Sequence, residues 1–225
     1  VECMENEPLY NAGRGSVLDA EGNISMDASI MRGHDQAAGS VVGLQSSRHP
    51  VRAAKRLMEN GWPVMLAGPA GDVFAAENGV EQVEKAWLET QLRRAQWDKW
   101  RRERLQPGAT DEEDALLDHD AEHDGWGTVG AVALDVHGNL AAATSTGGMT
   151  GKPPGRVGDT PIIGAGTWAD KHIAVSCTGV GEAFIRTAAA HAVASFHQDR
   201  SLESAADAML DLVEPLGGRG GVIAV

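Results

Sequence analysis

Hydrophobic positions in the first hundred residues alternate between short branched runs and longer stretches with helical spacing. Residues Ala37–Leu44 form an apolar, branched run typical of a strand, and Pro63–Ala67 predicts a second, short buried strand. Between them, His49–Asn60 has the spacing of a helix, with a proline near its start and a glycine after its last residue. Ahead of these elements, Asn11–Gly33 is rich in Gly, Asn, Asp and Ser, which predicts loop and turns.

The pattern changes sharply at Thr128. Residues Glu81–Arg104 have helical spacing but are very polar, and Pro107–Gly127 is acidic and poor in branched residues. We therefore predict a mobile acidic connector within residues 90–127. Thr128–Asp135 is then apolar on both alternating faces, which predicts a strand in a sheet that is covered on both sides.

The last hundred residues continue as strands and helices. After a turn at His137-Gly-Asn, a second strand at Leu140–Thr144 returns to form a hairpin. The further elements are strands at Ile173–Cys177 and Val222–Val225, and helices at Glu182–His197 and Leu202–Leu212. This order predicts an α+β fold of layered helices and mostly antiparallel sheets.

Length and charge limit the classes of protein that fit. A chain of 225 residues suggests a single domain, and a net charge of −13 repels nucleic-acid phosphates and anionic membranes. No apolar run is long enough to span a bilayer, and no signal-peptide pattern opens the chain. The two cysteines, Cys3 and Cys177, are too few for a secreted disulfide framework. We expect a cytoplasmic protein that binds a small molecule or dipeptide, and neither nucleic acid nor membrane.

Thr128 is the first candidate for chemistry, because it opens a buried strand directly after a glycine and a polar connector. A threonine hydroxyl needs a base beside it, and its own α-amino group can serve once the preceding peptide bond is cut. That amine titrates near pH 8 in model peptides, close enough to neutrality to accept a proton. Gly127 tolerates the backbone angles that an attack by the Thr128 hydroxyl on its carbonyl requires. Gly127 followed by Thr128 therefore predicts that the protein cleaves its own peptide bond between these two residues.

Three other motifs supply groups that such a nucleophile needs. The segment from Thr144 to Thr150 follows the second strand of the hairpin, so its hydroxyls emerge beside Thr128. Arg156 and Asp159 offer a fork donor and a carboxylate that match the carboxylate and ammonium of an amino acid. Residues 178–182 join a strand to a helix, where backbone N–H groups can stabilise an oxyanion.

Long stretches of the sequence resemble plant-type asparaginases and isoaspartyl peptidases, which are N-terminal-nucleophile hydrolases. The resemblance rests on the run GTVGAVALDVHGNLAAATSTGGMTGKPPGRVGDTPIIGAGTWAD, on SCTGVGEAFIR, and on ENEPLYNAGRGSVLDAEGNISMDASIMRG near the start. It implies a four-layer αββα sandwich, cleavage between Gly127 and Thr128, and a homodimer of cleaved αβ protomers. Residues 1–89 then belong to the α subunit, 90–127 form the connector at its end, and 128–225 are part of the β subunit.

The resemblance also implies a role for individual residues. Thr128 is the nucleophile and Thr146 its hydroxyl neighbour, Arg156 and Asp159 clamp the head of the substrate, and Thr178 and Gly179 form the oxyanion hole. Gly181 contacts the bound substrate, and Asn11 is a further candidate for substrate binding. No cofactor is expected for catalysis. A structural sodium ion is implied in a loop whose backbone oxygens come from Met4, Glu5, Glu7, Tyr10, Ala12 and Arg14.

The ends of the chain depart from that family pattern. Family members begin with a strand that ends in His-Gly-Gly-Ala-Gly and continue with further strands after the present Val225, and neither is found here. The chain also opens and stops in mid-pattern. We therefore expect a single domain over 1–225 that is truncated at both ends.

The expected activity is hydrolysis of the side-chain amide of L-asparagine and of β-aspartyl (isoaspartyl) dipeptides through an acyl-threonine, with release of L-aspartate. Two alternatives stay open: a glycosylasparaginase, and an unprocessed, inactive homologue or fragment that acts as a binding or structural module. Simpler interpretations of single residues also exist. A threonine at the start of a strand is usually only a β-former, and Arg156 with Asp159 could be a surface ion pair of little energetic weight. His119, Asp120 and His123 have a metal-like spacing but no further ligand of obvious geometry.

Overall fold

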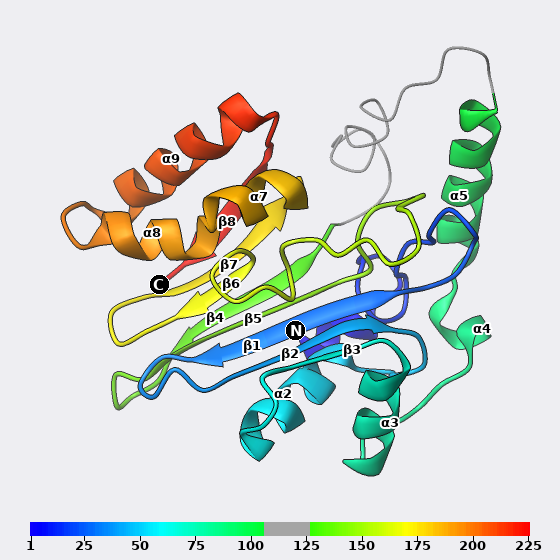
Figure 1. Cartoon of the computed structure of the whole chain (residues 1–225), viewed down its shortest axis with the longest axis horizontal. Helices are drawn as coiled ribbons and strands as arrows, with labels where there is room; N and C mark the ends of the chain where they lie inside the picture. Colours follow the sequence, from blue (N-terminus) through cyan, green and yellow to red (C-terminus); the bar gives the residue numbers. More distant parts are fainter. Residues whose placement is uncertain (106–126) are drawn as a thin grey trace.

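Two β-sheets lie at the centre of the structure (Figure 1). This computed structural model describes residues 1–105 and 127–225. The larger sheet has the strand order β3-β2-β1-β5-β4 and the smaller one β6-β7-β8. The strands are β1 (Met26–Arg32), β2 (Ala38–Leu44), β3 (Met65–Ala67), β4 (Val129–Leu134), β5 (Leu140–Thr146), β6 (Thr167–Ala169), β7 (Ala174–Gly179) and β8 (Gly220–Ala224).

The larger sheet is mixed, whereas the smaller one is wholly antiparallel. Strands β1, β2, β4 and β5 pair antiparallel with their neighbours, but β3 runs parallel to β2. In the smaller sheet, β7 pairs antiparallel with both β6 and β8. The sheets are therefore mostly antiparallel, as expected, with β2–β3 as the parallel exception, and the coarse class is a mixed α/β fold with two sheets.

Helices cover one side of each sheet (Figure 1). Helix α2 (Pro50–Asn60) packs on β1 and β2, where its residues Val51 and Ala54 join a core that includes Leu44. Helices α8 (Ala189–His197) and α9 (Leu202–Val213) pack on the smaller sheet around Phe184. The other helices are α1 (Glu2–Glu5), α3 (Pro69–Glu77), α4 (Lys85–Leu88), α5 (Gln91–Arg104), α7 (Gly181–Thr187) and the 3-10 helix η1 (Glu214–Leu216). Within the described ranges, no helix is long and apolar enough to cross a membrane.

Hydroxyl groups join the facing sides of the two sheets. Thr144 of β5 lies 2.6 Å from the Thr167 hydroxyl of β6 and 2.7 Å from the Ser176 hydroxyl of β7. The Ser29 hydroxyl of β1 donates to the Thr160 carbonyl at 2.6 Å and lies 2.7 Å from the Thr167 hydroxyl. These groups are buried and hydrogen-bonded, so they link the sheets without leaving unsatisfied polar atoms.

Strand β1 corrects the prediction of loop over Asn11–Gly33. The loop prediction rested on the Gly, Asn, Asp and Ser content of this segment, which hid a strand in which buried apolar residues alternate with the buried polar residues Asp27 and Ser29. Gly43 N–H donates to Asp27 Oδ1 at 2.8 Å, whereas Asp27 Oδ2 is buried with no hydrogen-bond partner in the described part of the chain.

Three other elements differ from their predicted form. The helix predicted over Glu182–His197 is two helices, α7 and α8, because Ala188 between them has a φ of 48°. Strand β3 is partly exposed rather than buried. Strand β4 is buried at Val129 but exposed at Leu134, so the sheet is not covered on both sides along its whole length.

The predicted connector begins within a packed helix. Residues 91–104 form α5, where Trp97 Nε1 donates to the Asp19 carbonyl at 2.7 Å and Arg93 Nε donates to the Gly15 carbonyl at 2.6 Å. Both side chains are buried, so this part of residues 90–127 is fixed to the domain. The remainder of the predicted connector, 106–126, lies outside the described residues, and so does the considered metal ligand set at His119, Asp120 and His123.

Candidate active site

Thr128 and Thr146 face each other where two antiparallel strands meet. Thr128 precedes β4 and Thr146 ends β5, and the register pairs Val129 with Ser145. The two hydroxyl oxygens are 3.0 Å apart, within hydrogen-bond distance. Gly148 N–H donates to the Thr146 oxygen at 3.0 Å, which leaves the Thr146 hydroxyl hydrogen available for Thr128.

Asn11 braces the peptide bond that precedes Thr128. Its backbone N–H donates to the Gly127 carbonyl at 3.3 Å, and its own carbonyl accepts from Gly147 N–H at 2.9 Å. The side-chain Nδ2 donates to the Gly148 carbonyl at 2.6 Å, and Oδ1 accepts from Val17 N–H at 3.0 Å. The structure therefore places the Asn11 side chain in contacts within the protein, next to Thr128.

Thr178 and Gly179 lie at the end of β7, close to the Gly127–Thr128 bond. A Cβ atom placed on Gly127 would lie 3.9 Å from the Thr178 hydroxyl oxygen. Gly179 is confined, because a Cβ there would come within 2.5 Å of the Phe184 ring. The close approach explains why this position carries a glycine.

Arg156, Asp159 and Gly181 also lie together. A Cβ on Gly181 would lie 2.9 Å from Arg156 Nη2 and 3.0 Å from the Asp159 nitrogen. Arg156 does not pair with Asp159; it makes two bonds of 2.8 Å to Glu182, the second residue of α7. Glu182 is exposed, so this pair stands at the rim of the site. The contribution of Glu182 was missed in the sequence, where it was only part of the strand-to-helix junction.

Asp159 is a buried carboxyl group with an unsatisfied oxygen. Only 5% of the residue is exposed, and its Oδ2 has no hydrogen-bond partner. Burial raises the pKa of Asp159 from 3.8 to about 7, although the nearby Arg156 charge acts in the opposite direction. An unsatisfied buried carboxylate oxygen costs free energy, and a bound ammonium group would compensate that cost.

Two buried charged residues near the site, Lys152 and Asp27, were not found from the sequence. Lys152 donates from Nζ to the Ser25 carbonyl at 2.7 Å, and a Cβ on Gly148 would lie 2.7 Å from Nζ. Burial lowers the pKa of Lys152 and raises the pKa of Asp27, and each charge partly opposes the shift of the other. A lysine followed by two prolines in a glycine-rich stretch is typical of an exposed loop, so the pattern gave no signal of burial.

The predicted sodium loop, in α1 and the segment after it, includes Asn11 and therefore adjoins the Gly127–Thr128 bond. The carbonyls of Met4, Glu5 and Glu7 accept backbone hydrogen bonds from Glu7, Arg14 and Tyr10 respectively, and Met4 accepts a further one from Asn6 N–H. Hard cations bind oxygen ligands of this kind, and a structural ion held by these backbone oxygens stays a prediction. The described residues contain no cluster of three or more His, Cys, Asp or Glu side chains that could hold a metal.

Comparison with known proteins identifies the family of the chain. The Asparaginase family model matches residues 1–225. The chain is 45% identical over 233 residues to an isoaspartyl peptidase of Escherichia coli, covering all of this chain and 70% of that relative. It is 43% identical over 229 residues to an isoaspartyl peptidase/L-asparaginase of Mus musculus, covering all of this chain and 67% of that relative. The chain belongs to the asparaginase family.

Proposed function

We propose that this protein is a self-processing amidohydrolase that cleaves L-asparagine and β-aspartyl dipeptides through an acyl-threonine on Thr128. The observation that carries the proposal is the 3.0 Å contact between the Thr128 and Thr146 hydroxyl oxygens, directly after the Gly127–Thr128 bond. Relatives named isoaspartyl peptidase and isoaspartyl peptidase/L-asparaginase support the choice of substrates.

Processing begins with attack of the Thr128 hydroxyl oxygen on the Gly127 carbonyl carbon. The C–O bond forms, the C–N bond breaks, and the hydroxyl proton passes to the departing Thr128 nitrogen. Water then hydrolyses the resulting ester, which frees the hydroxyl and leaves Thr128 with an α-amino group. The Asn11 N–H supports this step, because its hydrogen bond to the Gly127 carbonyl oxygen stabilises the negative charge that develops there.

Turnover then uses the same hydroxyl with the new amine as its base. The amine accepts the hydroxyl proton while the oxygen attacks the side-chain carbonyl of the substrate, and the proton is passed on to the departing ammonia or amino acid. Water hydrolyses the acyl-threonine and releases L-aspartate. Thr146 orients the attacking oxygen, and Thr178 with Gly179 stabilises the oxyanion from the end of β7.

The substrate head group binds between Arg156 and Asp159. Asp159 accepts the α-ammonium group, because its buried Oδ2 lacks a hydrogen-bond partner. Arg156 takes the α-carboxylate with its fork of donors, and the exposed Glu182 carboxylate stands in for that group in the free protein. Gly181 leaves room for the bound substrate beside both residues.

The roles of Thr128 are tested with two variants that differ by one hydroxyl group. Thr128→Ala should remain uncleaved and should not hydrolyse L-asparagine or a β-aspartyl dipeptide. Thr128→Ser keeps a hydroxyl group, so it should retain measurable self-cleavage and turnover. Cleavage of the alanine variant at the Gly127–Thr128 bond would refute the assignment.

Four further expectations, on fold, ion, oligomeric state and location, belong to the same proposal. We propose a four-layer αββα sandwich, supported by α2 on one sheet and by α8 and α9 on the other. A sodium ion held by the loop from Met4 to Arg14 would be structural and would brace the segment that carries Asn11. We also propose a homodimer of cleaved protomers in the cytosol, in line with two cysteines that form no disulfide.

A further inference from the structure

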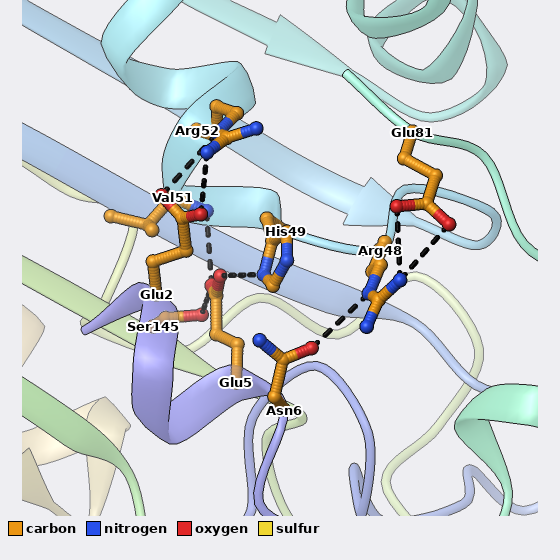
Figure 2. Close-up of polar contacts among 9 residues, drawn as sticks. All are labelled: Glu2, Glu5, Asn6, Arg48, His49, Val51, Arg52, Glu81 and Ser145. Atoms are coloured by element: carbon orange, nitrogen blue, oxygen red, sulfur yellow. Dashed lines mark hydrogen bonds and ion pairs between the residues drawn. The ribbon is translucent and has the colours of Figure 1, made fainter.

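The side chain of Glu5 is fully buried beneath the strand that carries Thr146. Its Oε1 accepts hydrogen bonds from the Ser145 hydroxyl at 2.6 Å and from Val51 N–H at 3.0 Å. Its Oε2 lies 3.3 Å from His49 Nδ1, and both atoms are buried. Figure 2 shows how α1, the start of α2 and strand β5 converge on this one carboxylate.

Ser145 links that carboxylate to the reaction site through the backbone of β5. Successive side chains of a strand point to opposite faces, so Ser145 points away from the face on which Thr144 and Thr146 lie. The register pairs Ser145 with Val129, the residue directly after Thr128. The hydrogen bond from Ser145 to Glu5 lies on the opposite face of β5 from Thr146. It therefore restrains the backbone of β5 directly before Thr146, where that strand pairs with the start of β4.

The same N-terminal segment also holds the other side of Thr146. Asn11 accepts from Gly147 N–H at 2.9 Å and donates to the Gly148 carbonyl at 2.6 Å. Thr146 is thus bracketed by contacts from Glu5 on one side and from Asn11 on the other. Only the contact from Glu5 is made by a charged group.

The surroundings of Glu5 suit a carboxylate whose geometry is fixed. Val51 N–H belongs to the first turn of α2, where backbone donors lack partners within the helix and the helix dipole favours a negative charge. The Ser145 hydroxyl donates to Glu5 Oε1 at 2.6 Å, a distance within the usual range of an O–H···O hydrogen bond. The Glu5 carboxylate is fully buried, so water cannot replace a hydrogen bond that it loses. Removal of one contact therefore disturbs the others in this network.

We propose that the Glu5 side chain is a positioning residue for the Thr128 site: through Ser145 it sets strand β5 so that the Thr146 hydroxyl stays within hydrogen-bond reach of Thr128. This inference rests on the proposed function. It concerns the Glu5 carboxylate and not its backbone carbonyl, which belongs to the predicted sodium loop.

Ser145→Ala is the most direct test, because it removes one hydroxyl group on the far side of the strand. Turnover of a β-aspartyl dipeptide is measured per processed site, well below the unfolding temperature of each variant. We expect kcat to fall about tenfold, the effect of one hydrogen bond to a charged group, with KM changed less than about twofold. A role in fold stability alone would lower the melting temperature without this selective loss of kcat.

The matched control is Glu2→Gln on the same helix. Glu2 is exposed and pairs with Arg52 at 2.5 Å across the surface (Figure 2), and exposed pairs contribute little. Its kcat and KM should equal those of the parent. If parent and control neither self-cleave nor hydrolyse the dipeptide, the proposed function fails; if they do and Ser145→Ala matches them, only the positioning role of Glu5 fails.

Substitutions at Glu5 complete a double-mutant cycle. Glu5→Gln keeps an oxygen that can accept from Ser145 and should lose less kcat than Glu5→Ala. The double variant Glu5→Ala with Ser145→Ala should have a kcat no lower than that of Glu5→Ala alone, because both changes remove the same bond. Fully additive losses in the double variant would overturn the proposal, and the Ser145→Ala result decides it if Glu5→Ala does not fold.

Discussion

At the scale of single residues, the environment of each group decides what it can do. Thr128 is half-buried with a hydroxyl neighbour, which suits a nucleophile that must be oriented and still reached by substrate. Cys177 shows the opposite case, since burial raises the pKa of its thiol and keeps it protonated. Cys177 is thus a packed side chain and not a competing nucleophile.

Asp159 gives a prediction about the pH dependence of stability. Its folded-state pKa of about 7 lies above the ordinary 3.8, so between these pH values the folded protein holds a proton that the unfolded chain has lost. The free energy of unfolding contributed by Asp159 therefore falls as pH rises through this range. The side chain of Asp159→Asn cannot ionise, so this variant does not lose that stability. The melting temperature of the variant minus that of the parent should therefore be larger at pH 8 than at pH 5.

The same variant separates stability from binding. The amide side chain that replaces the Asp159 carboxylate carries no charge for a substrate ammonium. KM for L-asparagine should therefore rise at least about tenfold even where the protein is more stable. A melting-temperature difference that is equal at both pH values would show that Asp159 is ionised across the range. An unchanged KM would remove Asp159 from the proposed substrate clamp.

At the scale of elements, the β4–β5 hairpin and the start of α7 assemble the site. The hairpin brings Thr128 beside Thr146 through its register, and α7 begins where β7 ends, so Gly181 meets the segment that carries Arg156 and Asp159. The relative positions of these site residues, which are distant in the sequence, are therefore set by the ends of the strands and by the start of α7.

Gly181→Ala tests the tight packing at the start of α7. The added Cβ would lie 2.9 Å from Arg156 Nη2, so the guanidinium group must move from its position. We expect KM to rise about tenfold, in line with the displacement of one charged hydrogen-bond donor, with a smaller change in kcat. Gly221→Ala on β8 is the control, because a Cβ there meets no atom within 4 Å. Equal KM values for both variants and the parent would contradict this packing argument.

The sequence predicted the apolar elements well and the polar ones poorly. The hairpin with Thr128 and the helices near α2 and α9 follow from hydrophobic spacing, because their buried faces are apolar. Strand β1 was missed because it lies in a stretch rich in Gly, Asn, Asp and Ser, and its buried polar residues Asp27 and Ser29 make their contacts only in the folded chain. Lys152 and the Glu5 carboxylate were missed for the same reason, since burial of a charged group depends on distant neighbours.

At the scale of the whole molecule, the two sheets are joined partly by hydroxyl groups rather than by apolar packing alone. Met31, Leu140 and Ala142 form part of a small apolar cluster between the sheets, and the Thr144 hydroxyl lies within the same interior. A polar link of this kind fixes the relative position of the sheets, because each hydrogen bond requires a specific geometry.

Thr144→Val tests this link, since it preserves shape and removes one hydroxyl group. The change deprives Thr167 and Ser176 of a shared partner in a fully buried place. We expect the free energy of unfolding in urea to fall by about 1–3 kcal/mol. Thr144→Ser keeps the hydroxyl group and should lose clearly less, and equal losses for both variants would assign the effect to packing.

Every proposed step of catalysis requires that Thr128 becomes the amino-terminal residue of a cleaved chain. Intact-mass analysis and N-terminal sequencing of the purified protein measure this without any assumption about the substrate. We expect two polypeptides, with the smaller one beginning Thr128-Val-Gly-Ala. A single uncleaved chain that hydrolyses β-aspartyl dipeptides, or a new terminus at another residue, would contradict the role of Thr128.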